Sequence, residues 1–211
     1  KFLKGQLPPT ILDVGCGDGS LSLWMLSGCQ RLVLNDVSEQ MLSRAKRLSS
    51  TRTGKAKIEF KLGDISSIGL GNETFDLIIC VGVLAHVVDP QKLLLKLDAL
   101  CRPGGTVIIE TTPAPKVIGQ KLRGMLKQTI KGDINYSAYA KRRMSVAELN
   151  GRCEKMGWEL IDSTQFSIPF VGFSLLPIWF RCGYTWTTWQ VPFLKNRGNE
   201  HVFAWQKHAH F

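Results

Sequence analysis

The sequence predicts an α/β fold with a doubly wound, mostly parallel sheet. Apolar runs of strand length alternate with amphipathic segments of helical spacing from Thr10 to Thr112. The run FDLIICVG is almost wholly apolar, as a strand covered on both faces should be. Polar and glycine-rich residues recur where these strands end. Open parallel sheets bind ligands at the carboxyl ends of their strands, so these residues are candidates for a functional site.

Five strands and three helices are expected in the first half of the chain. The second helix begins at Ser38, a suitable N-cap, and carries its apolar residues on one face. A turn, RPGG, precedes the fifth strand. The expected strands are 10–15, 31–36, 57–64, 75–82 and 106–112, and the expected helices are 20–27, 38–50 and 89–100.

The regular alternation of strands and helices stops after Thr112, but one domain over residues 1–211 is still expected. A helix over 145–157 opens with a capping box, and strands follow at 158–166 and 200–208. These last two strands are expected to pair as a hairpin, which gives seven strands with a terminal antiparallel one. Residues 1–112, which carry the glycine-rich and polar strand ends, would form the ligand-binding half. Two insertions, 113–144 and 166–199, would cap it after strands five and six.

The chain has 211 residues and a net charge of +10, and the charge is uneven. Between Lys116 and Arg143 there are eight basic residues and one acid, Asp133. Such a segment attracts nucleic acid, anionic membrane or an acidic substrate, or it is a solvated face. No apolar run is long enough to span a bilayer. The six cysteines form no CxxC pair, which indicates small buried hydrophobes in a reducing, cytoplasmic compartment.

The stretch ILDVGCGDGS joins the first strand to the first helix. Its glycines are spaced two apart, so backbone N–H groups can approach a ligand closely. The dinucleotide fingerprint G-x-G-x-x-G does not fit, because Gly19 comes one residue early and Ser20 stands in its place. The pattern D-x-G-x-G-x-G instead resembles the first motif of the class I S-adenosylmethionine-dependent methyltransferases.

Four further motifs extend this resemblance, in the family's order, over about Thr10 to Thr112. They are Asn35–Asp36 after the second strand, Leu62–Gly63–Asp64–Ile65 after the third, FDLIIC in the fourth, and RPGG before the fifth. The resemblance implies a Rossmann-like seven-stranded sheet and S-adenosylmethionine as the cofactor.

The resemblance also implies roles for individual residues. Asp36 would accept hydrogen bonds from both ribose hydroxyls, a role that would suit NAD equally well. Asp64 would accept from the adenine amine, and the backbone N–H of Ile65 would donate to the ring. Asp13 would lie near the methionyl ammonium, or cap the N–H groups of its own turn. The expected cofactor-binding residues are Asp13, Gly15, Cys16, Gly17, Asp36, Val37, Met41, Asp64, Ile65, Cys80 and Val81.

The segment GVLAHVVDP after the fourth strand is similar to one in the ubiquinone-pathway O-methyltransferases. His86 matches the histidine of that segment and is the candidate general base, or else a residue that fixes the loop. Ala85 stands where the relatives carry an acid, so we expect no metal ion.

The expected function is O-methylation of an aromatic, quinone-like or lipid-like small molecule. The aromatic residues of 166–199 favour such an acceptor, or else pack the cap onto the sheet. The alternatives are an RNA or protein methyltransferase and a non-catalytic cofactor-binding protein. Nucleic acid is not expected as a partner, because the fourth strand lacks an Asn/Asp-Pro-Pro-aromatic segment. The basic segment from Lys116 to Lys131 would be either a lid or a contact with anionic membrane.

Overall fold

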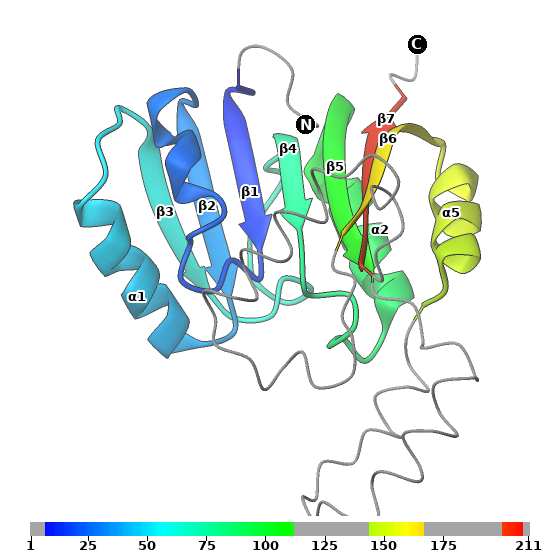
Figure 1. Ribbon diagram of the computed structural model, residues 1–211, viewed down its shortest axis with the longest axis horizontal. Helices are drawn as coiled ribbons and strands as arrows, with labels where there is room; N and C mark the ends of the chain where they lie inside the picture. The colour runs from blue at the N-terminus through cyan, green and yellow to red at the C-terminus, as the bar shows by residue number, and fades with distance from the viewer. Residues whose placement is uncertain (1–6, 112–143, 167–199, 209–211) are drawn as a thin grey trace, which may run out of the picture.

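The computed structural model describes residues 7–111, 144–166 and 200–208. The strands and helices alternate along the chain as the sequence predicts (Figure 1). In chain order they are β1 (Thr10–Val14), the 3₁₀ helix η1 (Leu23–Ser27), β2 (Arg31–Asp36), α1 (Glu39–Ser50), β3 (Lys57–Leu62), β4 (Phe75–Cys80), α2 (Pro90–Leu100), β5 (Cys101–Thr111), α5 (Val146–Lys155), β6 (Trp158–Phe166) and β7 (Glu200–Lys207).

The strands form one seven-stranded sheet in the order β3-β2-β1-β4-β5-β7-β6. β1 pairs in parallel with β2 and β4, and the parallel pairing continues outward to β3 and β5. β7 is antiparallel to both of its neighbours, β5 and β6. The predicted sheet with a terminal antiparallel strand and a β6–β7 pairing is therefore confirmed. β7 inserts between β5 and β6, so β6 forms the edge of the sheet.

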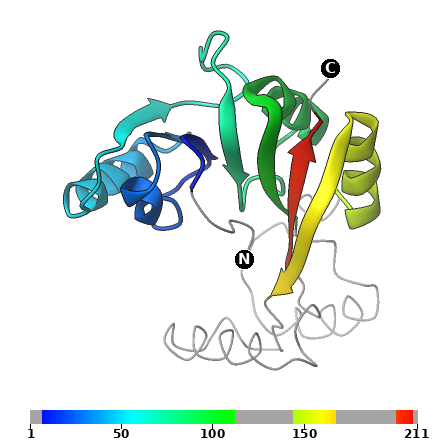
Figure 2. The same ribbon diagram turned by 90° about the horizontal axis from the view of Figure 1, so that it is seen from above.

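Helices cover both faces of the sheet, as Figures 1 and 2 show: α1 and η1 on one side, α2 and α5 on the other. Two apolar clusters result. One joins α2 and α5 to side chains of one sheet face, and the other joins α1 and η1 to the opposite face. β4 lies in the middle of the sheet, and all six of its residues are buried, as its apolar sequence predicts.

Each α-helix begins where a polar side chain satisfies a free backbone N–H of its first turn. Ser38 accepts from the N–H of Met41 at 3.3 Å, and Asp89 accepts from that of Lys92 at 3.0 Å. Ser145 accepts from the N–H of Glu148 at 3.1 Å. The predicted N-caps Ser38 and Ser145 are thus confirmed, and Asp89, predicted as a helix start, is also an N-cap.

Two local expectations differ from the structure. Residues 102–105, expected as a turn before the fifth strand, lie inside β5 as a bulge. Phe75 pairs with Cys101, and the next paired residues are Leu77 and Thr106. Residues 20–27, expected as a helix, form only the short 3₁₀ helix η1.

Five of the six cysteines are described, and all five are buried and unbridged, as expected. The predicted cap insertions and Cys182 lie outside the described residues, apart from the ends of the insertions. In the part of the chain that the structure describes, no helix is long and apolar enough to cross a membrane.

Candidate functional site

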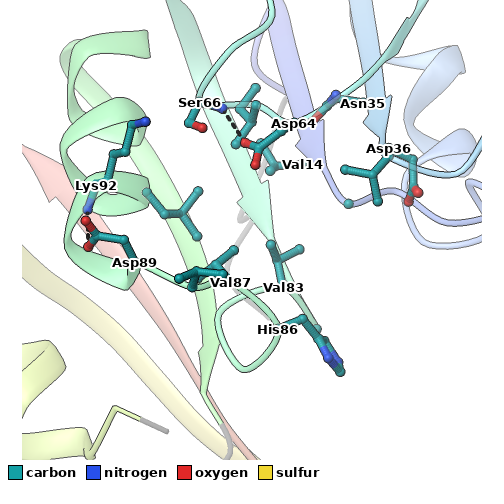
Figure 3. Close-up of a pocket in the computed structure, with 16 residues that line it drawn as sticks. Val14, Asn35, Asp36, Asp64, Ser66, Val83, His86, Val87, Asp89 and Lys92 are labelled. Carbon is teal, nitrogen blue, oxygen red and sulfur yellow. Dashed lines mark hydrogen bonds between the residues drawn. The ribbon is translucent and has the colours of Figure 1, made fainter. Parts of the chain in front are cut away.

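A cavity of about 700 Å³ opens at the carboxyl ends of the strands β1 to β4 (Figure 3). The ends of three neighbouring strands and the loop that follows β4 supply its walls. A volume of this size suits a ligand of a few hundred daltons. The lining residues are Val14, Gly15, Asn35, Asp36, Val37, Asp64, Ile65, Ser66, Gly82, Val83, His86, Val87, Val88, Asp89, Lys92 and Leu93.

The glycine turn after β1 depends on conformations that favour glycine. Gly15, Gly17 and Gly19 have φ values of +68°, +57° and +76°. A Cβ atom on Gly15 would lie 2.3 Å from Cγ2 of Val83, so this glycine lets the loop after β4 pack against the turn. A Cβ on Gly17 would meet no atom within 4 Å. The turn is also tied to β2, because the N–H of Cys16 donates to the carbonyl of Asn35 at 2.9 Å.

Asp36, the last residue of β2, lies at one end of the cavity with both carboxylate oxygens engaged. Oδ2 accepts from the N–H of Gly17 at 2.9 Å, and Oδ1 accepts from the N–H of Ser38 at 2.8 Å. Each carboxylate oxygen accepts about two hydrogen bonds, so both can still accept from a ligand hydroxyl. Asp36 therefore fixes the glycine turn and keeps acceptor capacity toward the cavity.

Asp13 is a buried carboxylate of β1, and the next two residues, Val14 and Gly15, line the cavity. Its side chain is 2% exposed, and Oδ2 has no hydrogen-bond partner among the described residues. Burial raises the pKa of Asp13 to about 7, the Ser22 side chain offsets part of this, and the charge of Asp36 adds to it. A charged carboxylate is costly to bury, so a cationic group close to Asp13 would stabilise its charged form.

The third acidic residue, Asp64, follows β3. Its Oδ1 accepts from the N–H of Ser66 at 2.7 Å, a bond drawn in Figure 3 that holds the pKa of Asp64 below its usual range. The buried side chain of Asn35 fixes the neighbouring backbone. Its amide donates to the carbonyls of Lys61 and Gly63 at 2.9 and 2.8 Å.

His86 lies on the loop between β4 and α2, where its backbone N–H donates to the carbonyl of Val83 at 2.8 Å. The residue is exposed, and its ring extends away from Asp64 and Ser66 (Figure 3). It lines the same cavity as Asp36, at the end of β2, and Asp64, after β3, but its side chain points away from Asp64 (Figure 3). This position suits contact with an acceptor better than contact with a nucleoside.

The charges around the cavity bear on the choice between the two cofactors that Asp36 alone would suit, S-adenosylmethionine and NAD. Of the described residues that line it, Asp36, Asp64 and Asp89 are acidic and Lys92 is basic, and Asp13 directly precedes the lining residue Val14 in sequence. The turn also leads into η1, a 3₁₀ helix, so it supplies no α-helix N-terminus for a pyrophosphate. The acidic set fits a ligand with a sulfonium and an ammonium group better than a dinucleotide.

Comparison with known proteins also indicates S-adenosylmethionine-dependent chemistry. A family model described as a methyltransferase domain matches residues 12–109. A ubiquinone biosynthesis O-methyltransferase of Coxiella burnetii is 33% identical over 168 residues, which cover 77% of this chain and 67% of that protein. The chain belongs to the class I S-adenosylmethionine-dependent methyltransferases.

Solved structures share the fold of this methyltransferase. An S-adenosylmethionine-dependent methyltransferase from Methanosarcina mazei superposes with a TM-score of 0.68 at 15% identity, over 99% of this chain and 96% of that one. The magnesium protoporphyrin IX methyltransferase of Synechocystis, with bound S-adenosylhomocysteine, superposes at 0.63 and 18% identity, over 95% and 74% of the two chains. S-adenosylmethionine is the cofactor of this methyltransferase.

The predicted site residues fall into two groups in this methyltransferase. The residues that line the cavity are Gly15, Asp36, Val37, Asp64, Ile65 and His86. The residues that lie outside its lining are Asp13, Cys16, Gly17, Met41, Cys80 and Val81. Cys80 is fully buried in the core and Met41 is half-buried on α1. The roles of both groups in binding the cofactor stay predictions.

Sequence reasoning missed several lining residues. Asn35 was adjacent to the predicted Asp36, and its amide character was a usable signal. Asp89 and Lys92 were predicted only as part of a helix start. Nothing in the local pattern singles out Val83, because its contact with Gly15 joins two loops that are distant in sequence. No described group of three or more His, Cys, Asp or Glu could hold a metal ion, and independence from metal stays a prediction.

Proposed function

We propose that this methyltransferase transfers the methyl group to an oxygen atom of a small aromatic, quinone-like or lipid-like acceptor. The observation that carries the proposal is the loop after β4. This loop resembles that of the ubiquinone-pathway O-methyltransferases, and it lines the cavity with Val83, Val87 and Val88. An apolar wall favours an apolar or planar acceptor. The 33% identity to a ubiquinone biosynthesis O-methyltransferase supports the same class of substrate.

The proposal assigns a separate role in methyl transfer to each of several described residues. When bound, S-adenosylmethionine supplies a methyl group on a sulfonium, which is a good leaving group. The protein therefore needs mainly to align the acceptor and exclude water. Asp36 would hold the ribose, Asp64 and the backbone N–H of Ile65 would hold the adenine, and Asp13 would favour the methionyl ammonium. His86 would remove the proton of the acceptor hydroxyl.

The attachment points of the two predicted caps support a shared role at the acceptor. Thr111 ends β5, and its Oγ1 donates to the carbonyl of Met144 at 3.2 Å. At the same corner, Phe166 of β6 pairs with Glu200 of β7. The described residues that flank the insertions 113–144 and 166–199 therefore lie together at the carboxyl end of β5, the neighbour of β4. We propose that both cover the acceptor.

A methylation screen tests this function. The protein would be incubated with S-adenosylmethionine labelled on the methyl group and, separately, with catechols, hydroquinones, carboxylic acids, amines, total RNA and a protein extract. The proposal expects label in phenolic ethers, which resist mild base. Label in RNA or protein would overturn it in favour of the macromolecular alternative. No transfer to any sample, with S-adenosylhomocysteine still bound, would favour a non-catalytic binding protein.

Contact with anionic membrane is a separate proposal about residues 116–131, which lie outside the described residues. Five basic side chains in this segment would attract anionic lipid by about 1 kcal/mol each, in a way that salt screens. Co-sedimentation with vesicles that contain or lack anionic lipid, at low and high salt, tests it. Sedimentation that needs anionic lipid and falls with salt supports membrane contact, and no sedimentation favours a lid. A cytoplasmic location remains a prediction.

A further inference from the structure

Glu110 is a buried acidic residue near the carboxyl end of β5. The proposed function assigns no role to it. Its side chain is 7% exposed. Its Oε2 accepts from the backbone N–H of Gly82 at 2.9 Å. Gly82 is the second residue after β4, and it lines the cavity. The bond therefore joins a core carboxylate to the first residue of a cavity wall.

The position of this bond explains how β4 ends. β4 and β5 pair regularly until Cys80 and Ile109, and the chain of β4 then leaves the sheet. Gly82 takes a φ of +74°, so the backbone turns there, and the Glu110 carboxylate receives an N–H that the strand pairing no longer engages. A bond from an amide to a buried carboxylate is stronger than one between neutral groups.

The same loop is held on its other side by the glycine turn. Val83 occupies the space that a side chain on Gly15 would fill. The loop after β4 is therefore fixed by a charged hydrogen bond at Gly82 and by close packing at Val83. Residues of the cavity wall, including His86 and Val87, follow directly.

We infer that Glu110 is a positioning residue for the cofactor and acceptor cavity. It holds the N–H of Gly82 and through it sets the course of the loop 82–89. This inference does not depend on which acceptor is methylated, because the loop lines the cavity whatever the acceptor is.

The chain provides a matched control for loss of a buried carboxylate. Asp76 is also 7% exposed, but it lies at the opposite end of β4. It accepts from the N–H and the hydroxyl of Thr10 at 2.8 and 2.6 Å, and it pairs with Arg102. Removing Asp76 should weaken the core without disturbing the cavity, so it separates loss of stability from loss of positioning.

The test compares Glu110→Ala, Glu110→Gln and Asp76→Ala in the full chain. Hydrogen exchange reports on peptides from 81–89, and calorimetry reports the affinity for S-adenosylhomocysteine. Glu110→Ala should speed exchange in 81–89 and weaken binding about tenfold. Glu110→Gln keeps an acceptor oxygen at the same reach, so it should restore binding to within about threefold of the parent. Asp76→Ala should lower the melting temperature and leave both readouts unchanged.

Three results would overturn the inference. One is a folded Glu110→Ala variant with unchanged exchange and affinity. Another is a Glu110→Gln variant as impaired as Glu110→Ala, which would show that an acceptor oxygen at this reach does not position the loop. The third is an Asp76→Ala variant with the same loss of affinity. If Glu110→Ala does not fold, Glu110→Asp takes its place, because its carboxylate is one methylene further from Gly82. Neither readout involves turnover, so the result is separate from that of the methylation screen.

Discussion

Oδ2 of Asp36 accepts a hydrogen bond from the backbone N–H of Gly17 at 2.9 Å, which links the end of β2 to the glycine turn after β1. One carboxylate thus fixes the glycine turn and faces the cavity. This dual position explains why an acid suits the end of β2 better than a neutral side chain. A carboxylate can accept from two backbone amides and still accept from two ribose hydroxyls.

Replacing Asp36 should weaken cofactor binding. If Asp36 holds the ribose, Asp36→Ala leaves its two hydroxyls poorly paired, and the expected loss is about 2–3 kcal/mol, or roughly 30- to 150-fold in the dissociation constant of S-adenosylhomocysteine. Calorimetric titration measures it. The control is Asp18→Ala, an exposed aspartate of the same turn whose carboxylate accepts from Ser20. An affinity within threefold of the parent would contradict the assignment of Asp36.

The 2′-deoxy analogue of S-adenosylhomocysteine separates ribose binding from support of the turn. If Asp36 contacts the hydroxyls, the analogue binds the parent weakly and binds Asp36→Ala no worse than the normal ligand does. This is a double-mutant cycle with one change made in the ligand. A penalty for the analogue that is equal in both proteins would leave Asp36 with only its role in the turn.

Asp13 should couple folding stability to pH. Its pKa is 3.8 in an unfolded chain and about 7 in the fold, chiefly because it is buried. The folded chain therefore holds this proton more tightly, and the contribution of Asp13 to the free energy of unfolding falls as pH rises from about 4 to about 7. The difference in stability between Asp13→Asn and the parent should shift in favour of the variant over that range. A difference that stays constant with pH would contradict the prediction.

Binding of the cofactor should release the same proton. A methionyl ammonium near Asp13 favours the charged carboxylate, so S-adenosylhomocysteine should displace a proton at about pH 6 and much less at about pH 8. Calorimetry in buffers of different ionisation enthalpy measures the release. Asp13→Asn should show none at either pH. Equal release by parent and variant would place the ammonium elsewhere.

The order of the elements could be predicted from sequence because each depends on local signals. The apolar run of β4, the N-caps Ser38 and Ser145 and the helix start at Asp89 are such signals, and all were confirmed. The bulge in β5 was missed, because the pairing of Cys101 with Phe75 is a contact between strands that local turn residues do not encode. The contacts of Glu110 and Val83 were missed for the same reason.

Gly15 should tolerate alanine less well than Gly17 does. Both have positive φ, so both variants carry the same kind of backbone strain. Only at Gly15 would the new Cβ overlap Val83, which adds about 1–3 kcal/mol of destabilisation from overpacking. Denaturant unfolding of both variants measures the difference. Val83→Ala added to Gly15→Ala should recover part of it, and equal losses at the two glycines would show that the loop relaxes.

His86 should govern the proton transfer without governing cofactor binding. It lies on the exposed part of the loop after β4, and its ring extends away from Asp64 (Figure 3). With the acceptor found in the screen, His86→Ala should lower kcat by about 10²–10⁴ and leave the affinity for S-adenosylhomocysteine unchanged. The acidic limb of the rate profile should disappear with the histidine. His208→Ala is the control, because this exposed histidine follows β7, which is antiparallel to β5 and therefore ends at the opposite end of the strands from the cavity. A His86→Ala variant that keeps its rate and its pH dependence would leave His86 with a structural role in the loop, and the base would then have to come from elsewhere in the chain or from the acceptor itself.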